Sequence, residues 1–83
     1  MSGNVMTIDD FRRLLEDVLD QSDLSVGPET TAQDIEGWDS LSHVRLLVRI
    51  EQQYRIDLPL GEIEDAKNVG DLLRITNRLC AGR

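Results

Sequence analysis

One segment, residues 39–54, limits the possible folds of this chain more than any other. Its apolar residues cover a wide arc of a helix, and only a thin polar strip interrupts them. The apolar positions are Leu41, Val44, Leu46, Leu47, Val48, Ile50 and Tyr54. A helix that is apolar around most of its circumference is covered by other elements. We therefore predict a helix that opens at Asp39-Ser40, runs to about Tyr54 and lies at the centre of a bundle.

Two narrower amphipathic segments flank the central one. The first begins at Thr7, with Asp10 three residues later, and should end near Ser22. The last begins at Asn68, with Asp71 in the same capping spacing. Their stripes consist of Ile8, Phe11, Leu14, Leu15, Val18 and Leu19, and of Val69, Leu72, Leu73, Thr76, Leu79 and Cys80. Each stripe is expected to face the core of the bundle.

The connection between the first two helices is long. Residues 23–39 have no helical period, and a plain loop of this length is unusual in a compact domain. Its expected anchors to the core are Leu24, Val26, Ile35 and Trp38. A short helix is expected at residues 61–66, after Pro59 has stopped the central helix. We predict one all-α domain over residues 1–83, with an ordered core at about 7–80, three main helices, one short helix and a long first loop.

Composition and charge exclude several classes of function. Nine basic residues stand against 16 acidic ones, a net charge of −7, which argues against nucleic acid and anionic membranes as partners. Cys80 is the only cysteine and His43 the only histidine, so neither a disulfide nor a structural zinc site is expected. No signal-peptide pattern or membrane-spanning run is present. We expect a cytoplasmic protein without membrane insertion.

Catalysis by the chain itself is not expected. His43 lies three residues after Ser40 on the same predicted helix. A nucleophilic serine needs a base, an orienting acid and an oxyanion hole from different elements, and a domain this small cannot enclose them. His43 is interpreted as a half-buried residue beside Leu47 and Ile50. We predict that the protein is not an enzyme.

The run Gly37-Trp38-Asp39-Ser40-Leu41 is the most informative motif. A serine at a helix start usually caps the helix, but here Asp39 can do so and leave the Ser40 hydroxyl exposed. Backbone N–H groups and the helix dipole would stabilise a phosphate ester on that hydroxyl. Leu41, at the start of the apolar arc, would hold the serine in place. This arrangement suits a serine that another enzyme modifies.

This motif and its context resemble the acyl carrier protein family. The matching residues are Asp39-Ser40-Leu41, Val44, Leu47, Ile50-Glu51, Tyr54, Ile56-Asp57-Leu58-Pro59 and Val69-Gly70-Asp71-Leu72. The triplet alone has little specificity, but it follows a loop, opens the second main helix and lies near the middle of an acidic chain of carrier length. The resemblance spans about residues 8–80.

The resemblance implies a carrier function. Ser40 would receive 4′-phosphopantetheine from coenzyme A through a phosphopantetheinyl transferase, which would recognise Asp39 and Leu41 beside it. The thiol of the group would then hold an acyl or aminoacyl group as a thioester. An acyl- or aminoacyl-loading ligase and a downstream acyltransferase or synthase would be further partners of a monomeric carrier. Tethering keeps the reactive thioester at high effective concentration for these enzymes.

The chain also departs from the family's pattern. Fatty-acid carriers tend to have carboxylates along the second helix, but here the polar strip contains Arg45 and Arg49, and Ser42-His43 replaces the usual acidic start. Trp38 is unlike the Gly or Ala common at that position. We interpret Trp38, Ser42, His43, Arg45 and Arg49 as a partner-binding surface of a stand-alone polyketide-like, peptidyl or aminoacyl carrier.

Two alternatives remain open at this point. The charged strip is equally well explained as a solvated helix face with no specific partner. The chain is alternatively a non-catalytic helical adaptor that binds a partner through the basic strip and has no prosthetic group. In that case Ser40 would do no more than cap its helix.

Overall fold

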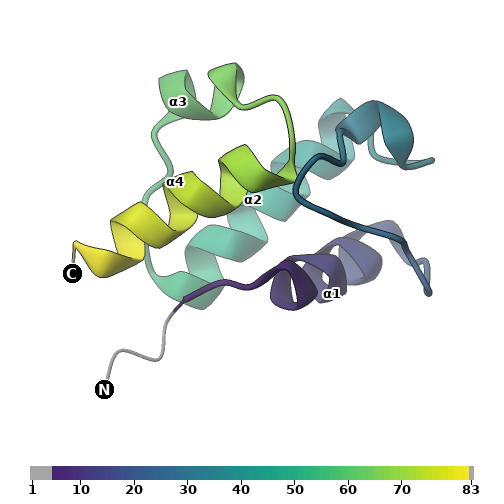
Figure 1. Cartoon of the computed structure of the whole chain (residues 1–83), viewed down its shortest axis with the longest axis horizontal. Coiled ribbons are helices and arrows are strands. Elements are labelled where there is room, and N and C mark those ends of the chain that lie inside the picture. Colours follow the sequence, from purple (N-terminus) through teal and green to yellow (C-terminus); the bar gives the residue numbers. More distant parts are fainter. Residues whose placement is uncertain (1–4, 83) are drawn as a thin grey trace.

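A computed structural model describes residues 5–82, which form four α-helices and one short 3₁₀-helix (Figure 1). The helices are α1 (Ile8–Leu19), α2 (Ser40–Tyr54), α3 (Leu60–Asp65) and α4 (Val69–Ala81). The 3₁₀-helix η1 (Ala32–Asp34) lies within the long connection between α1 and α2. Residues 5–82 contain no strand. The predicted all-α class, with three main helices, one short helix and a long first loop, is confirmed.

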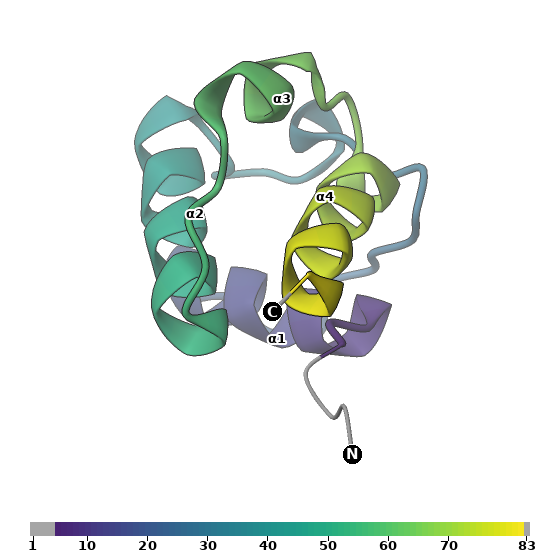
Figure 2. The same cartoon turned by 90° about the vertical axis from the view of Figure 1, so that its left-hand side faces the viewer.

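The four helices surround one hydrophobic core. In Figure 2, α2 and α4 lie on opposite sides, with α1 below them and α3 above. α1 packs against α2 and α4, and α3 packs against α4. The buried apolar side chains are those of Met6, Phe11, Leu14, Leu15, Ile35, Trp38, Leu46, Ile50, Ile56, Leu58, Ile63, Val69, Leu72 and Ile75. They come from every helix and from the loops, so no helix is independent of the others.

Only one face of α2 is buried, which corrects the prediction that this helix is central. Leu46 and Ile50 are fully buried. Leu41, Val44 and Val48 are 62%, 56% and 42% exposed. These three side chains lie three and four positions apart and form an apolar stripe on the surface. The wide apolar arc led to a wrong prediction, because a sequence does not distinguish apolar residues that are exposed from those that are buried.

The hydrophobic core includes a residue that precedes α1. Met6 is only 2% exposed. Its backbone N–H donates to Asn77 Oδ1 at 2.7 Å, and its carbonyl accepts from Asn77 Nδ2 at 3.0 Å. One side chain of α4 therefore satisfies both backbone groups of Met6.

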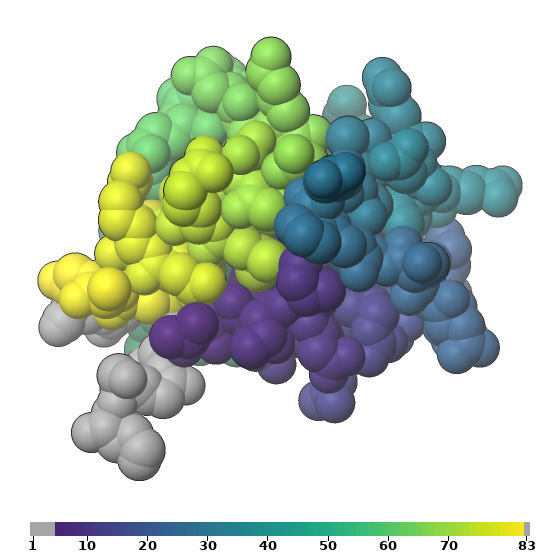
Figure 3. Space-filling model, in the orientation of Figure 1, coloured from purple at the N-terminus to yellow at the C-terminus, as the bar shows by residue number. Residues whose placement is uncertain are grey.

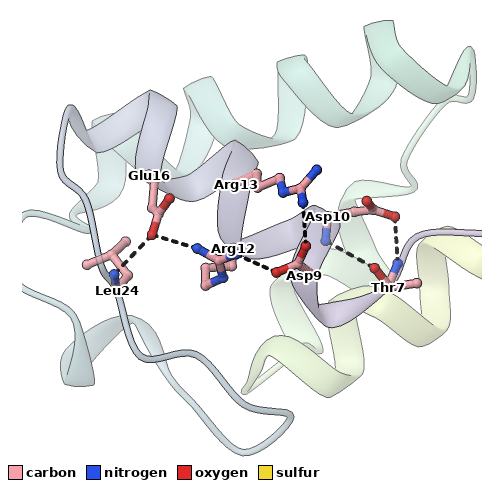
Figure 4. A network of polar contacts seen from close by, with 7 residues as sticks. All are labelled: Thr7, Asp9, Asp10, Arg12, Arg13, Glu16 and Leu24. Carbon is pink, nitrogen blue, oxygen red and sulfur yellow. Dashed lines mark hydrogen bonds and ion pairs between the residues drawn. The ribbon is translucent and has the colours of Figure 1, made fainter.

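α1 begins as its sequence predicts and ends earlier. Thr7 and Asp10 form a capping box, with both backbone-to-side-chain distances at 3.1 Å (Figure 4). The helix ends at Leu19 rather than near Ser22, because Asp20 adopts the left-handed conformation with φ 56°. Aspartate tolerates this conformation better than most residues.

Glu16 fastens the start of the long loop to α1. Its carboxylate accepts from the backbone N–H of Leu24 at 3.0 Å and from Arg12 Nη1 at 3.0 Å (Figure 4). Arg12 also pairs with Asp9 one turn earlier. A side chain on the polar face of α1 therefore orders the loop in addition to being solvated.

The far part of the loop closes the N-terminus of α4. The backbone N–H groups of Val69 and Gly70 donate to the carbonyls of Thr30 and Pro28, each at 2.8 Å. Figure 3 shows the blue loop lying against the start of α4. The first N–H groups of a helix have no partner within the helix. Here the loop carbonyls accept from them in place of water. The loop is ordered by these bonds and by the buried Ile35 and Trp38.

This contact predicts that Gly70→Ala destabilises the protein. A Cβ at residue 70 would lie 3.0 Å from the Pro28 carbonyl oxygen, which is held in place by its bond to Gly70. Gly61 of α3 is the matched control, because a Cβ there meets nothing within 4 Å. We expect Gly61→Ala to stabilise by up to about 1 kcal/mol from helix propensity, and Gly70→Ala to lower the urea midpoint. Equal shifts for both variants would contradict a tight contact.

Candidate functional site

Asp39 caps α2, as the sequence predicts. Its backbone is extended (φ −107°, ψ −170°), and its carboxylate accepts from the backbone N–H of Ser42 at 2.9 Å. Hydrogen bonding from Ser42, first through the backbone N–H, lowers the pKa of the Asp39 carboxyl. The cap is therefore formed by the ionised residue, and Ser40 is not needed for it.

The Ser40 hydroxyl is exposed and available. Among the described residues it makes no hydrogen bond, and neither does its backbone N–H. Ser42, two residues later, differs because its hydroxyl donates to the Gly37 carbonyl at 3.0 Å. Gly37 has φ 89°, a conformation that L-residues rarely adopt, and so turns the chain sharply before the helix. Of the two serines in this turn, only Ser40 has a free hydroxyl.

The start of α2 fits a phosphate group on Ser40. A helix of this length carries partial positive charge at its N-terminus, and the unbonded N–H of Ser40 lies there. The N-terminus of α4 differs, because loop carbonyls already occupy its first donors. Of the two helix starts, that of α2 is the one open to an added anion.

Trp38 and His43 form a hydrogen-bonded pair beside this turn. The indole is 7% exposed, and its Nε1–H donates to His43 Nδ1 at 3.1 Å. The Trp38 ring also packs on Phe11 of α1, with ring centroids 5.9 Å apart. Burial lowers the pKa of His43, which favours the neutral imidazole.

The sequence predicted a half-buried His43 correctly but missed its partner. Nothing in the spacing of Trp38 and His43 signals a bond across a helix start, since periodicity describes only faces of one helix. The buried indole offers other proteins little surface. Its place in a partner-binding surface stays a prediction, limited to the part of the ring that borders the groove beside Ser40.

A groove of about 550 Å³ opens beside Ser40, between α2 and α3. Its lining residues are Ala32, Trp38, Asp39, Ser40, His43, Leu47, Leu60, Ile63, Glu64 and Ala66. Most of these are apolar, and the charged ones are the carboxylates Asp39 and Glu64. Ser40 is itself part of the groove, so a group attached to it begins there.

The other side of α2 combines charge with exposed apolar surface. Arg45 makes no ion pair among the described residues, whereas Arg49 pairs with Asp17 of α1. A shallow groove of about 430 Å³ lies between α1 and α2, lined by Asp17, Val18, Val44, Arg45, Val48 and Arg49. The structure therefore brings both predicted arginines to one surface, but only Arg45 is unpaired there. Sequence reasoning missed the apolar part of this surface because it assigned those residues to the core.

Two further kinds of feature are absent from the described residues. They contain no cluster of three or more metal-ligating side chains. None of their helices is long and apolar enough to cross a membrane.

Comparison with known proteins decides the family. The sequence model of the protein family described as the phosphopantetheine attachment site matches residues 9–75, which include the whole of α2. The chain belongs to this family. As a phosphopantetheine-binding carrier it holds covalently attached 4′-phosphopantetheine and is not an enzyme.

A solved structure supports the same assignment. The carrier is 39% identical to the holo acyl carrier protein from Geobacter metallireducens, known from solution NMR, with a TM-score of 0.85. The match covers 92% of this chain and 87% of that one. Among the curated proteins none matches. The fold is that of an acyl carrier protein, which confirms the resemblance found in the sequence.

Proposed function

We propose that Ser40 is the attachment residue for 4′-phosphopantetheine. The observation that carries the proposal is the free, exposed hydroxyl of Ser40 at the open N-terminus of α2. Asp39 supplies the cap, and Leu41, which is 62% exposed, is available to the transferase as a recognition contact. When bound, the group supplies the thiol for a thioester. The protein's own residues hold and present the phosphate end.

Intact mass after coexpression with a broad-specificity phosphopantetheinyl transferase tests the proposal. We expect the protein to gain one phosphopantetheine and a peptide map to place it on residue 40. An unchanged mass would instead favour the alternative of a helical adaptor without a prosthetic group. Coexpression with an inactive transferase is the control.

The proposal includes a monomeric carrier domain over residues 1–83 that works in the cytoplasm. Its cargo would be an acyl or aminoacyl group, with a polyketide-like or nonribosomal peptide pathway as the setting. A loading ligase and a downstream acyltransferase or synthase would be its enzymes besides the transferase. The departures of α2 from an acidic surface support a specialised pathway rather than general fatty-acid synthesis.

We further propose that the loading enzyme binds α2 through carboxylates or neutral polar groups near Arg45. Arg45 is exposed on α2, between one and two turns beyond Ser40, and has no ion pair among residues 5–82. Charge complementarity at such a rim mainly sets the rate of encounter and excludes wrong partners. The proposed contact surface also includes three other residues of α2. Ser42 and His43 lie between Ser40 and Arg45, and Arg49 lies one turn beyond Arg45.

This proposal predicts that Arg45→Glu slows loading of the holo protein several-fold at low salt, with the effect fading as salt screens the charges. Arg49→Glu should slow loading less, since Arg49 is already paired with Asp17. Arg74→Glu on α4 is the control for net charge, because Arg74 is equally a surface residue, with a side chain 72% exposed. If Arg45→Glu is loaded at the wild-type rate, the arginines belong to a solvated helix face that has no specific partner. A faster rate would show a basic partner.

A further inference from the structure

The groove beside Ser40 contains one neutral polar pair among its apolar walls. This pair is Trp38 with His43, and it lies one turn from the proposed attachment residue. The cap of α2 does not use it, because that role belongs to Asp39. The pair therefore needs an explanation of its own.

The Trp38 indole determines which nitrogen of His43 carries the proton. An indole N–H can only donate, so His43 Nδ1 must accept and be unprotonated. The neutral imidazole then carries its proton on Nε2. The two ring nitrogens point in divergent directions, so Nε2–H is directed away from the buried indole. Among the described residues nothing accepts a hydrogen bond from it.

The position of His43 on the helix places its imidazole beside Ser40, in the same groove. Residues three apart on a helix are neighbours on its surface. Helical side chains also lean towards the N-terminus, over the preceding turn. The bond from Trp38, five residues earlier, shows that the imidazole does lie over that turn.

We propose that His43, oriented by Trp38, donates its Nε2–H to a phosphodiester oxygen of the prosthetic group on Ser40. This inference rests on the proposed attachment at Ser40. His43 acts as a binding residue for the protein's own prosthetic group, and Trp38 is its positioning residue. The contact fastens the phosphate end of the arm at the groove, and the donor is neutral, so no lysine or arginine is required.

The surroundings of the imidazole make the contact measurable by titration. The titratable groups that line the groove with His43 are Asp39, from the start of α2, and Glu64, from α3. On the side of α1, the apolar ring of Phe11 packs against Trp38 of the pair. Burial favours the uncharged imidazole in the unmodified protein, and an adjacent phosphodiester anion would favour the charged form. The pKa of His43 should therefore rise on phosphopantetheinylation.

The experiment is a pH titration of the whole holo protein followed by ³¹P and imidazole ¹⁵N NMR. A phosphodiester has no ionisation of its own near neutral pH, and His43 is the only histidine. We expect the ³¹P resonance to shift with the same midpoint as the imidazole, and that midpoint to lie above the one in the apo protein. In the apo protein the ¹⁵N shifts should show the Nε2–H tautomer.

Three variants separate the two roles. His43→Gln and His43→Asn should both abolish the ³¹P inflection, and only Gln, which places an N–H at the ε position, should keep the wild-type ³¹P shift above the midpoint. Trp38→Phe keeps an aromatic ring on Phe11 but removes the indole donor, so the imidazole should become a mixture of tautomers.

The outcomes that overturn the inference are distinct from failure of the proposed function. A ³¹P resonance that stays constant while the wild-type imidazole titrates would overturn the contact between His43 and the phosphate. An apo protein with the Nδ1–H tautomer would do the same. A protein that gains no phosphopantetheine, by intact mass, would overturn the attachment at Ser40 and the inference together.

Discussion

Replacement of Ser40 by Ala should abolish phosphopantetheine incorporation completely while leaving the helical fold intact. The hydroxyl is the proposed nucleophile for transfer from coenzyme A, and no other residue can replace it in the same position. Stability should change little, since the side chain is exposed and Asp39 still caps α2. Intact mass after coexpression with the transferase measures incorporation, and far-UV circular dichroism checks the fold.

Ser42→Ala is the matched control, because Ser42 lies in the same turn but its hydroxyl is bonded to the Gly37 carbonyl. This variant should still gain one group per chain. Incorporation that persists in Ser40→Ala and disappears in Ser42→Ala would move the site to Ser42. Incorporation in both single variants would point to a further serine, such as Ser25.

The second large effect is expected in the core of α2, where two adjacent leucines differ in burial. Leu46 is fully buried, whereas Leu47 is partly exposed at the groove beside Ser40. Leu46→Ala should therefore cost about 2–5 kcal/mol of the free energy of unfolding. Leu47→Ala should cost about 1 kcal/mol, because less apolar area is removed from contact.

Urea denaturation of both variants at the same pH measures the difference. A typical domain has only about 5–15 kcal/mol of stability, so Leu46→Ala should be close to the limit of folding. If it does not fold, Leu46→Val keeps the comparison with Leu47→Val measurable at smaller cost. Equal midpoints for the two positions would contradict the placement of the buried face of α2.

Local signals along the chain were sufficient to predict most of the helices. Capping residues such as Thr7, Asp39 and Asn68 mark helix starts through bonds to neighbours three residues away, which the sequence contains directly. The motif Asp39-Ser40-Leu41 could be recognised for the same reason, because its residues are neighbours in the sequence. The end of α1 was predicted less well. It depends on the left-handed conformation of Asp20, which an aspartate can adopt but does not have to adopt.

What the sequence could not provide was the pairing of surfaces. Leu41, Val44 and Val48 look like core residues by type, and only the arrangement of the other helices leaves them uncovered. Leu15 of α1, by contrast, was predicted as core and is fully buried. The Trp38–His43 bond and the pairing of Arg49 with Asp17 each join residues whose approach depends on tertiary structure.

The anchoring of Met6 to Asn77 has a consequence for how such a unit can be incorporated into larger assemblies. That anchor brings the first described residues beside α4, and Figure 1 shows these residues and the end of α4 on the opposite side of the molecule from the start of α2. Polypeptide that continues from either end of the described residues would start away from Ser40. Fusion partners, affinity tags and surface immobilisation at the termini should therefore leave the modified end free to swing between enzymes, so the same fold can serve as a separate shuttle or as a link in a longer chain.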